Sequence, residues 1–267
     1  MRRTPPRLTV VAIAGLLLAG CGSSSTPTAA PATPSTTVSS APALSGTINV
    51  FAAASLKKAF TTLGKQFEAA RPGTKVVLNF GPSSGLATQI NQGAPADVFA
   101  SASTKNMDQV VKAGGATSPT DFASNVMEIA VPPTNPANVT QLSDLAKSSV
   151  KVALCQKAVP CGVTAAKVFS NAKLTVTPVT QEVDVKAVLT KVTLGEVDAG
   201  VVYVTDVQAA GTKVKGVVIP ADVNASTKYP IATLTKASNK ATAQAFTDYV
   251  LSADGASVLT ADGFAKP

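Results

Sequence analysis

The chain has 267 residues, 45% of them hydrophobic, so it is long enough to bury one large core or two smaller ones. The absence of histidine excludes His-dependent serine or cysteine triads and His-ligated metal sites. The formal net charge of +8 falls by three, to +5, once Arg2, Arg3 and Arg7 leave with an N-terminal leader. The lysines are scattered and tryptophan is absent, so nucleic-acid binding is not expected. Arg71 is the one arginine after these three, which excludes a multi-arginine anion clamp.

The N-terminus has the pattern of an export signal. Three arginines precede the apolar run Leu8–Ala19, which is short for a membrane span, and the sequence Leu18-Ala19-Gly20-Cys21 resembles the lipobox of bacterial lipoproteins. That resemblance implies a signal peptide at 1–20 and a lipid anchor on Cys21. A simple signal peptide and an uncleaved anchor are the alternatives. Residues 22–46, rich in Ser, Thr, Ala and Pro, predict a disordered tether, and the rest of the chain is expected outside the cytoplasm.

From residue 47 strands and helices alternate, which is the order of a parallel sheet with right-handed crossovers. The predicted strands are Ile48–Phe51, Lys75–Phe80 and Asp97–Ala102, and the predicted helices are Leu56–Ala70, one that contains Leu86 and Ile90, and one that passes through Val110. Ser55 lies at the first strand–helix junction, where its hydroxyl is expected to cap the helix. Ser83 follows the second strand. Both serines therefore lie at carboxyl ends of strands, where such sheets bind ligands, and helix N-termini there favour anions.

The second half of the chain predicts another lobe. A strand at Val126–Val131 is expected to cross into it and a strand at Tyr229–Leu234 to cross back. The strands predicted between them are Val150–Leu154, Leu174–Val179, Ala199–Val204 and Val217–Ile219, and the helices are Gln141–Ala146, one around Ala165–Phe169, and Val185–Val192. Asp184 is expected to cap the last of these helices and Asp97 to end a strand. A C-terminal helix at Ala241–Leu251 and a turn at Ala256–Leu259 follow.

Five motifs in register resemble the molybdate-binding proteins of ABC importers. They are Phe-Ala-Ala-Ala-Ser-Leu (51–56), Ser-Gly-Leu-Ala-Thr-Gln-Ile (84–90), Gly-Ala-Pro-Ala-Asp-Val-Phe-Ala-Ser-Ala (93–102), Ala-Gly-Val-Val-Tyr-Val-Thr-Asp (199–206) and Tyr-Pro-Ile-Ala (229–232). The resemblance covers 47–267 and implies an α/β, two-lobed class II periplasmic-binding-protein fold. Each lobe would be a mostly parallel sheet flanked by helices, and two hinge strands would join them. Lobe 1 would comprise 47–126 and 233–267, and lobe 2 would comprise 127–232 with the hinge strands.

The resemblance also implies a binding site for a tetrahedral dianion, molybdate or tungstate, held only by neutral hydrogen-bond donors. The implied donors are Ser55 through its hydroxyl and N–H, Ser83 through its hydroxyl, Cys161 and Val185 through their N–H groups, and Tyr203 through its hydroxyl. Ser84 is the alternative to Ser83, because Gly81-Pro82 leaves the placement open by one residue. Many hydrogen bonds must replace the water of an enclosed dianion, and helix N-termini and fixed hydroxyls can supply them.

Cys161 stands where the family more usually has alanine, and Cys155 lies six residues before it. In an oxidising compartment these two are expected to form a disulfide, which would stiffen the ligand loop. Two free thiols or a metal pair are the alternatives. The implied partners are the oxyanion, an ABC permease and the membrane reached by the lipid anchor. No cofactor is expected, the metal being molybdate alone, and the protein is expected to be a monomer and not an enzyme.

Three other functions remain open. One is a receptor of the same fold for sulfate, thiosulfate, phosphate or a metal ion, although the lack of histidine and the scarcity of arginine disfavour metals and sugar phosphates. Another is a secreted hydrolase with a Ser–Lys mechanism, in which Ser55 and Lys58 would act together. The third is a surface adhesin on an anchored tether, which predicts no affinity for a small ligand.

Overall fold

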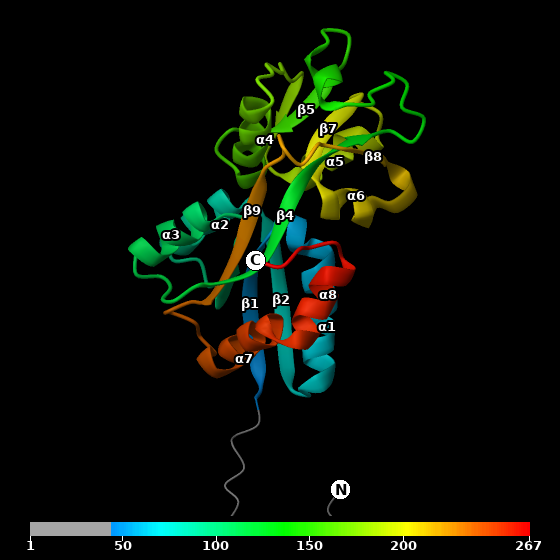
Figure 1. Cartoon of the computed structure of the whole chain (residues 1–267). Helices are drawn as coiled ribbons and strands as arrows, with labels where there is room; N and C mark the ends of the chain where they lie inside the picture. Colours follow the sequence, from blue (N-terminus) through cyan, green and yellow to red (C-terminus); the bar gives the residue numbers. More distant parts are fainter. Residues whose placement is uncertain (1–43) are drawn as a thin grey trace, which may run out of the picture. The chain divides into compact units, whose positions relative to one another are not determined.

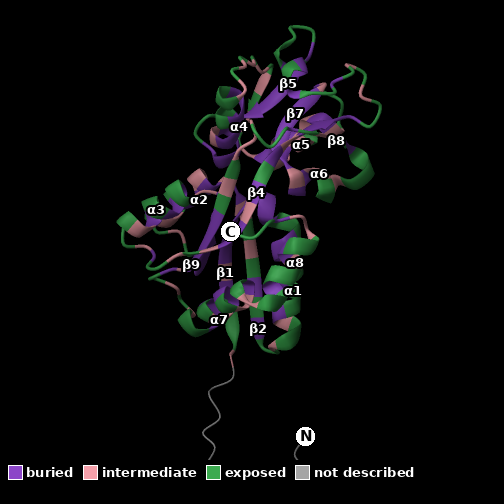
Figure 2. Cartoon of the chain, in the orientation of Figure 1, coloured by how far each residue is buried: buried purple, intermediate pink, exposed green. Residues whose placement is uncertain are grey.

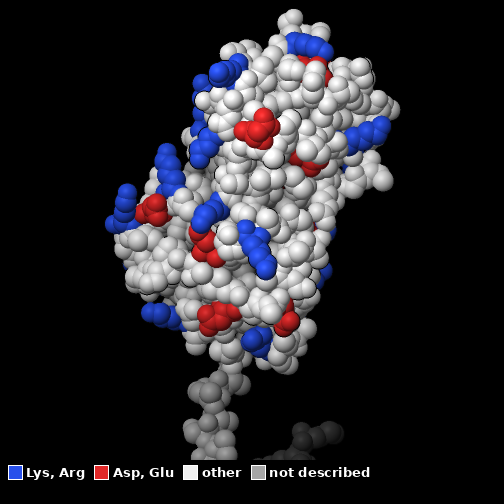
Figure 3. Space-filling model, in the orientation of Figure 1, with Lys and Arg blue, Asp and Glu red and all other residues white. Residues whose placement is uncertain are grey.

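The structure, a computed structural model, describes residues 44–267. The predicted signal at 1–20, the predicted lipidation site Cys21 and most of the predicted tether lie outside the described residues. None of the helices within 44–267 combines the length and the apolar character needed to cross a membrane. Lys and Arg side chains are interspersed with Asp and Glu over the face seen in Figure 3.

The sheet of the first lobe combines parallel and antiparallel pairs. Its strands are β1 (Gly46–Ala53), β2 (Thr74–Gly81), β3 (Val98–Ala100), β9 (Ser226–Thr233) and the first half of β4 (Thr120–Val131). β1 lies between β2 and β3 and is parallel to both. β9 is antiparallel to β3 on one side and to β4 on the other.

The second lobe shares β4 with the first. From Met127 onward β4 pairs antiparallel with β7 (Ala199–Tyr203) and, from Glu128, with β8 (Lys215–Val218). β5 (Val152–Cys155) then pairs in parallel with β7 and with β6 (Thr180–Glu182). β4 thus runs from one lobe into the other, beside β9 (Figure 1).

Each lobe has its own hydrophobic core because its sheet is covered by helices. In the first lobe Ile48 and Val50 of β1 lie in one core with α1 (Lys57–Ala70), α7 (Lys240–Leu251) and α8 (Ala253–Ala261). Phe51, the residue after Val50, points to the opposite face of the sheet and packs there with α2 (Ser83–Asn91) and α3 (Thr104–Lys112). Figure 2 shows the buried strands inside these exposed helix faces.

The second lobe has a single hydrophobic core, whose buried members fall between Met127 and Ile219 in the sequence. All five residues of β7 are buried, as expected of a strand covered on both faces. The helices of this lobe are α4 (Pro160–Asn171), α5 (Val185–Thr193) and α6 (Val204–Ala210), with short 3-10 turns at Leu142–Ala146 and Gly211–Lys213.

Most of the predicted elements are present, with shifted ends. The strand predicted at Leu174–Val179 is wrong, because pairing begins only at Val179, whose N–H donates to the Val152 carbonyl. Pro178 has no N–H to donate, so the ladder cannot extend through it. The helix α6 was not expected from the sequence, because its first residue, Val204, was predicted to end the strand Ala199–Val204. Tyr229 and Ile231 of β9 pack in the first lobe's core, and the lobe boundaries at 126/127 and 232/233 stay a prediction.

Candidate binding site

A small cavity lies between the two lobes. Its lining includes the five predicted site residues Ser55, Ser83, Cys161, Val185 and Tyr203. The cavity has a volume of about 20 Å³. This is smaller than the usual site for an organic ligand of drug size, about 300–1,000 Å³. Of the described residues, those that line the cavity include no lysine or arginine, and Asp184 is the charged one.

Ser55 comes from the turn that joins β1 to α1. The turn is a 3-10 helix over Ala54–Leu56, so Leu56 occupies the N-cap position of α1 and the hydroxyl of Ser55 caps nothing. The capping prediction is therefore wrong, since the extra turn moves Ser55 one residue away from the cap. Its Oγ lies 2.9 Å from the hydroxyl oxygen of Tyr229 on β9. The N–H of Ser55, at the start of this turn, is among those without a partner within the helix, whereas the N–H of Lys57 already donates to the Ala54 carbonyl.

Ser83 is the first residue of α2, directly after β2 and Pro82. It is buried, and its Oγ accepts a hydrogen bond of 3.0 Å from the N–H of Ala102, which lies in a bend two residues after the end of β3. Ser84 is not part of the cavity lining, and its carbonyl accepts the hydroxyl of Thr88 along the helix. The geometry therefore favours Ser83 over Ser84 as the residue that faces the cavity.

The N-terminus of α4 brings Cys161 to the cavity from the second lobe. Pro160 is the first helical residue and has no N–H, so the N–H of Cys161 is one of those left without an intrahelical partner. A disulfide joins Cys161 to Cys155 at the end of β5, with the Cα atoms 5.8 Å apart. The loop between them is tight: a Cβ on Gly162 would lie 2.0 Å from the carbonyl oxygen of Gln156. Only glycine fits there without moving the loop.

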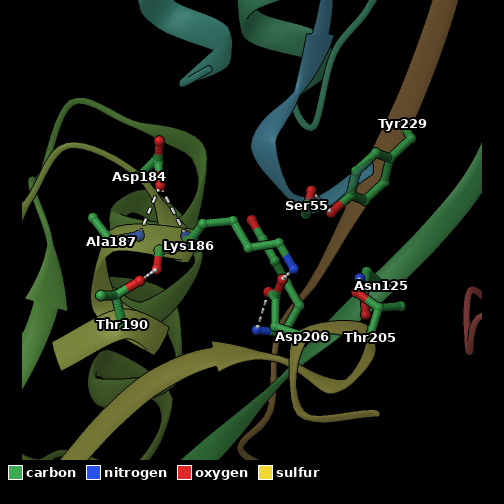
Figure 4. A network of polar contacts seen from close by, with 10 residues as sticks. Ser55, Asn125, Asp184, Lys186, Ala187, Thr190, Thr205, Asp206 and Tyr229 are labelled. Atoms are coloured by element: carbon green, nitrogen blue, oxygen red, sulfur yellow. Dashed lines mark hydrogen bonds and ion pairs between the residues drawn. The ribbon is translucent and has the colours of Figure 1, made fainter. Parts of the chain in front are cut away.

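Val185 opens α5. The prediction that Asp184 caps this helix is confirmed, because its Oδ1 accepts the N–H groups of Lys186 at 2.8 Å and Ala187 at 2.9 Å (Figure 4). The cap leaves the N–H of Val185 outside the helix ladder, at the cavity. Asp97, also given a structural role, receives hydrogen bonds from the N–H of Asn49 and from the N–H and hydroxyl of Ser238.

Tyr203 ends β7 and closes the cavity on the second lobe's side. Its side chain is buried, and its hydroxyl has no hydrogen-bond partner among the described residues. Burial raises the pKa of Tyr203 above its usual value of 10.0; the nearby Thr164 hydroxyl opposes this shift, and the Asp206 carboxylate adds to it. The phenol therefore stays protonated and is available as a neutral donor. Thr164 gives its own hydroxyl hydrogen to the Pro160 carbonyl. An unsatisfied buried hydroxyl is rare and calls for a partner.

An ion pair that the sequence did not indicate lies next to the site, between α5 and α6. Lys186 Nζ lies 2.6 Å from Oδ1 of Asp206, whose carboxylate is fully buried, and Asp206 Oδ2 accepts the N–H of Tyr203 at 3.1 Å. The pair therefore connects the turn that holds Val185 to the strand end that holds Tyr203 (Figure 4). Burial raises the pKa of Asp206, and Lys186 opposes the shift. Asp206 is the last residue of the motif 199–206, and its place in that motif was the sequence feature that could have indicated its role.

Next to this pair, a hydrogen bond connects the two lobes. Asn125 Nδ2 on β4 donates to Thr205 Oγ1 on α6 at 2.8 Å, and both side chains are buried (Figure 4).

The geometry does not support a Ser–Lys hydrolase. Lys58 Nζ is paired with Asp262 at 2.7 Å and its side chain is half exposed, whereas Ser55 is paired with Tyr229.

Comparison with known proteins identifies the family. The model of the family "bacterial extracellular solute-binding protein" matches residues 48–265. The molybdate-binding protein ModA of Mycobacterium tuberculosis is 43% identical over 259 residues, which cover 96% of each chain. ModA of Escherichia coli is 32% identical and covers 82% of this chain and 89% of that relative.

Solved structures agree with the predicted fold. The periplasmic molybdate-binding protein of Azotobacter vinelandii covers 82% of this chain and 99% of its own, with a TM-score of 0.73 and 20% sequence identity. The two-lobed class II periplasmic-binding-protein fold predicted from the sequence is thereby confirmed. The chain belongs to the bacterial extracellular solute-binding proteins and, within them, to the family of the molybdate-binding proteins.

Proposed function

We propose that the protein captures molybdate, and tungstate with it, in the cavity between its lobes and delivers the anion to an ABC importer. The observation that carries this proposal is the set of neutral donors around one small cavity. Two serine hydroxyls face it from the first lobe, and two helix N-termini and the Tyr203 hydroxyl face it from the second.

Neutral donors suit a dianion that must bind reversibly. Each hydrogen bond to a charged group contributes about 1.5–3 kcal/mol of stabilising free energy. Several of them together offset the cost of removing the anion's hydration shell. The partial positive charges at the N-termini of α4 and α5 add to this without a formal counter-charge. A protonated oxyanion such as hydrogen phosphate needs an acceptor, and a smaller anion such as sulfate would fit loosely.

We further propose that the protein is an extracytoplasmic lipoprotein anchored through Cys21. The lipobox-like sequence before Cys21 supports this, as does a 31% identical relative of Bacillus subtilis described as a putative ABC transporter substrate-binding lipoprotein. Binding would close the lobes by a hinge motion at β4 and β9, where the chain passes between them. The closed form would then be recognised by the permease, and the protein acts as a receptor, not as an enzyme.

Calorimetric titration of the full chain with a panel of anions tests the proposal. We expect saturable binding of molybdate and tungstate at one site and, in a thermal-shift assay, stabilisation by these two anions. Sulfate and phosphate should bind far more weakly. Sulfate is the main competitor, because the sulfate-binding protein SubI shares the fold with a TM-score of 0.72 at 16% identity. Stabilisation by sulfate or phosphate but not by molybdate would overturn the assignment.

Reduction of the disulfide is expected to weaken anion binding. The Cys155–Cys161 bond closes a short loop that carries the N–H of Cys161, so its removal frees the loop and adds an ordering cost to binding. We expect a loss of affinity of several-fold and a loss of stability of about 2 kcal/mol. Titration with and without reductant measures the first effect. A Cys155→Ala, Cys161→Ala double variant, which keeps the backbone N–H, should not respond to reductant. Equal affinity of the reduced and oxidised wild type would contradict the prediction.

A further inference from the structure

Both serines at the cavity are held by another group of the protein. Ser83 Oγ accepts the backbone N–H of Ala102 at 3.0 Å, so its one hydroxyl hydrogen is not used in that bond. Ser55 Oγ lies 2.9 Å from the hydroxyl of Tyr229, a contact in which either oxygen can be the donor. The direction of this second bond decides whether Ser55 presents a hydrogen or a lone pair to the cavity.

The hydroxyl of Tyr229 is fixed in position. Tyr229 is fully buried and is not among the residues that line the cavity, so it does not reach the anion itself. Its ring packs edge-on against Tyr203, Phe122 and Phe264, with centroids 6.3, 6.2 and 5.3 Å away. In Figure 4 the ring projects from β9 and its oxygen meets Ser55. Three aromatic contacts therefore hold the phenol against this serine.

The two possible directions of the Ser55–Tyr229 hydrogen bond are not equivalent when an anion is bound. If Ser55 donates to Tyr229, its lone pairs face the anion and repel it. If Tyr229 donates to Ser55, the hydrogen of Ser55 is free for the anion, and the two bonds reinforce each other. Burial raises the pKa of Tyr229 well above its usual value, so the phenol keeps the hydrogen that this arrangement needs.

We propose that Tyr229 is a positioning residue for anion binding: its hydroxyl donates to Ser55 Oγ and thereby directs the only hydrogen of Ser55 at the oxyanion. The Ala102 N–H does the same for Ser83. The inference rests on the proposed function and deepens it, because it explains specificity. When both serines act as donors, the first lobe offers the anion hydrogens and no hydroxyl acceptor, which disfavours an oxyanion that carries a proton. The Asp184 carboxylate on the second lobe's side is engaged through its Oδ1 as the cap of α5.

A double-mutant cycle on the full chain tests this. Molybdate is titrated into the wild type, Tyr229→Phe, Ser55→Ala and the double variant. Tyr229→Phe keeps the ring and its aromatic contacts and removes only the hydroxyl. We expect it to weaken molybdate binding about tenfold, as for the loss of part of one charge-assisted hydrogen bond. In the Ser55→Ala background the same change should have almost no effect, because Tyr229 acts through Ser55.

Anion selectivity is a second measurement, and it should not change if the role of Tyr229 were only structural. In Tyr229→Phe the Ser55 hydroxyl can rotate and accept, so the ratio of phosphate to molybdate affinity at neutral pH should rise relative to the wild type. Tyr249→Phe is the matched control, because its hydroxyl donates to Gln66 at an exposed site, and it should change neither quantity.

The outcomes separate the two proposals. Wild-type protein that fails to bind molybdate would overturn the proposed function. If the wild type binds molybdate, two results would overturn the positioning role alone. One is that Tyr229→Phe weakens molybdate binding equally in the wild-type and Ser55→Ala backgrounds, and the other is that it does not weaken binding at all. An unchanged phosphate-to-molybdate ratio in Tyr229→Phe would also contradict it.

Discussion

Replacing Tyr203 by phenylalanine is expected to stabilise the ligand-free protein and to weaken molybdate binding. The Tyr203 hydroxyl is buried and has no hydrogen-bond partner among residues 44–267, so it costs folding free energy in the absence of the anion. Removing such an orphaned group gains about 1–3 kcal/mol. The same hydroxyl is a proposed donor to the dianion, and losing one charge-assisted bond of about 1.5–3 kcal/mol raises the dissociation constant roughly ten- to hundred-fold.

Urea denaturation with and without molybdate measures both effects on one sample. The midpoint of Tyr203→Phe should lie above that of the wild type without molybdate, and the increase in midpoint that molybdate causes should be smaller. Tyr249→Phe serves again as the control, since its hydroxyl already has the partner Gln66 at an exposed site. A variant that is less stable in both conditions would contradict the idea that the hydroxyl is held unsatisfied for the ligand.

The parts of the site that could be predicted from sequence share one property: each lies at a strand or helix end inside a short motif. Ser55 follows β1 and Tyr203 ends β7, whereas Val185 and Cys161 lie in the first turns of α5 and α4. A local sequence pattern specifies such positions. That they line a common cavity does not follow from local pattern, and here the family resemblance supplied what periodicity could not.

The groups that hold these residues were not predictable, because their partners are distant in sequence. Tyr229 is 174 residues from Ser55, and the contact exists only because β9 returns to the first lobe's sheet next to β3. Asp206 meets Lys186 across two helices of the second lobe. The wrong capping prediction for Ser55 has a related cause: a 3-10 turn before α1 shifts the register by less than one helical turn, which a pattern of apolar residues cannot resolve.

Removal of the Lys186 charge is expected to have the largest effect on stability of any single change at the site. Lys186→Met leaves the Asp206 carboxylate fully buried without its partner 2.6 Å away. Breaking a buried pair from one side costs about 3–5 kcal/mol, because the remaining charge has neither water nor a counter-ion. Molybdate affinity should fall as well, since Asp206 holds the N–H of Tyr203 and Lys186 follows Val185.

Two controls separate this effect from the loss of any surface charge. Lys191→Met on the same helix breaks an exposed pair with Glu196, also 2.6 Å long, and should cost at most about 1 kcal/mol. The double variant Lys186→Met, Asp206→Asn removes both charges and keeps an acceptor for the Tyr203 N–H, so it should recover most of the stability. A double variant as unstable as Lys186→Met would show that packing of the lysine stem, not the charge of Asp206, is responsible.

The pH dependence of the Lys186→Met deficit identifies the carboxylate as its source. Burial already raises the pKa of Asp206 above the usual 3.8, and without Lys186 to oppose it the pKa rises further. A raised pKa means that the folded protein binds the proton more tightly than the unfolded chain, so stability falls as the pH rises from 3.8 through the folded-state pKa. The deficit relative to the wild type should therefore be largest at high pH and shrink as the pH falls below the folded-state pKa of Asp206, where this carboxyl is protonated in both folded proteins. Denaturation midpoints measured across this range should converge on the acid side, and a constant difference would rule out a buried charge as the cause.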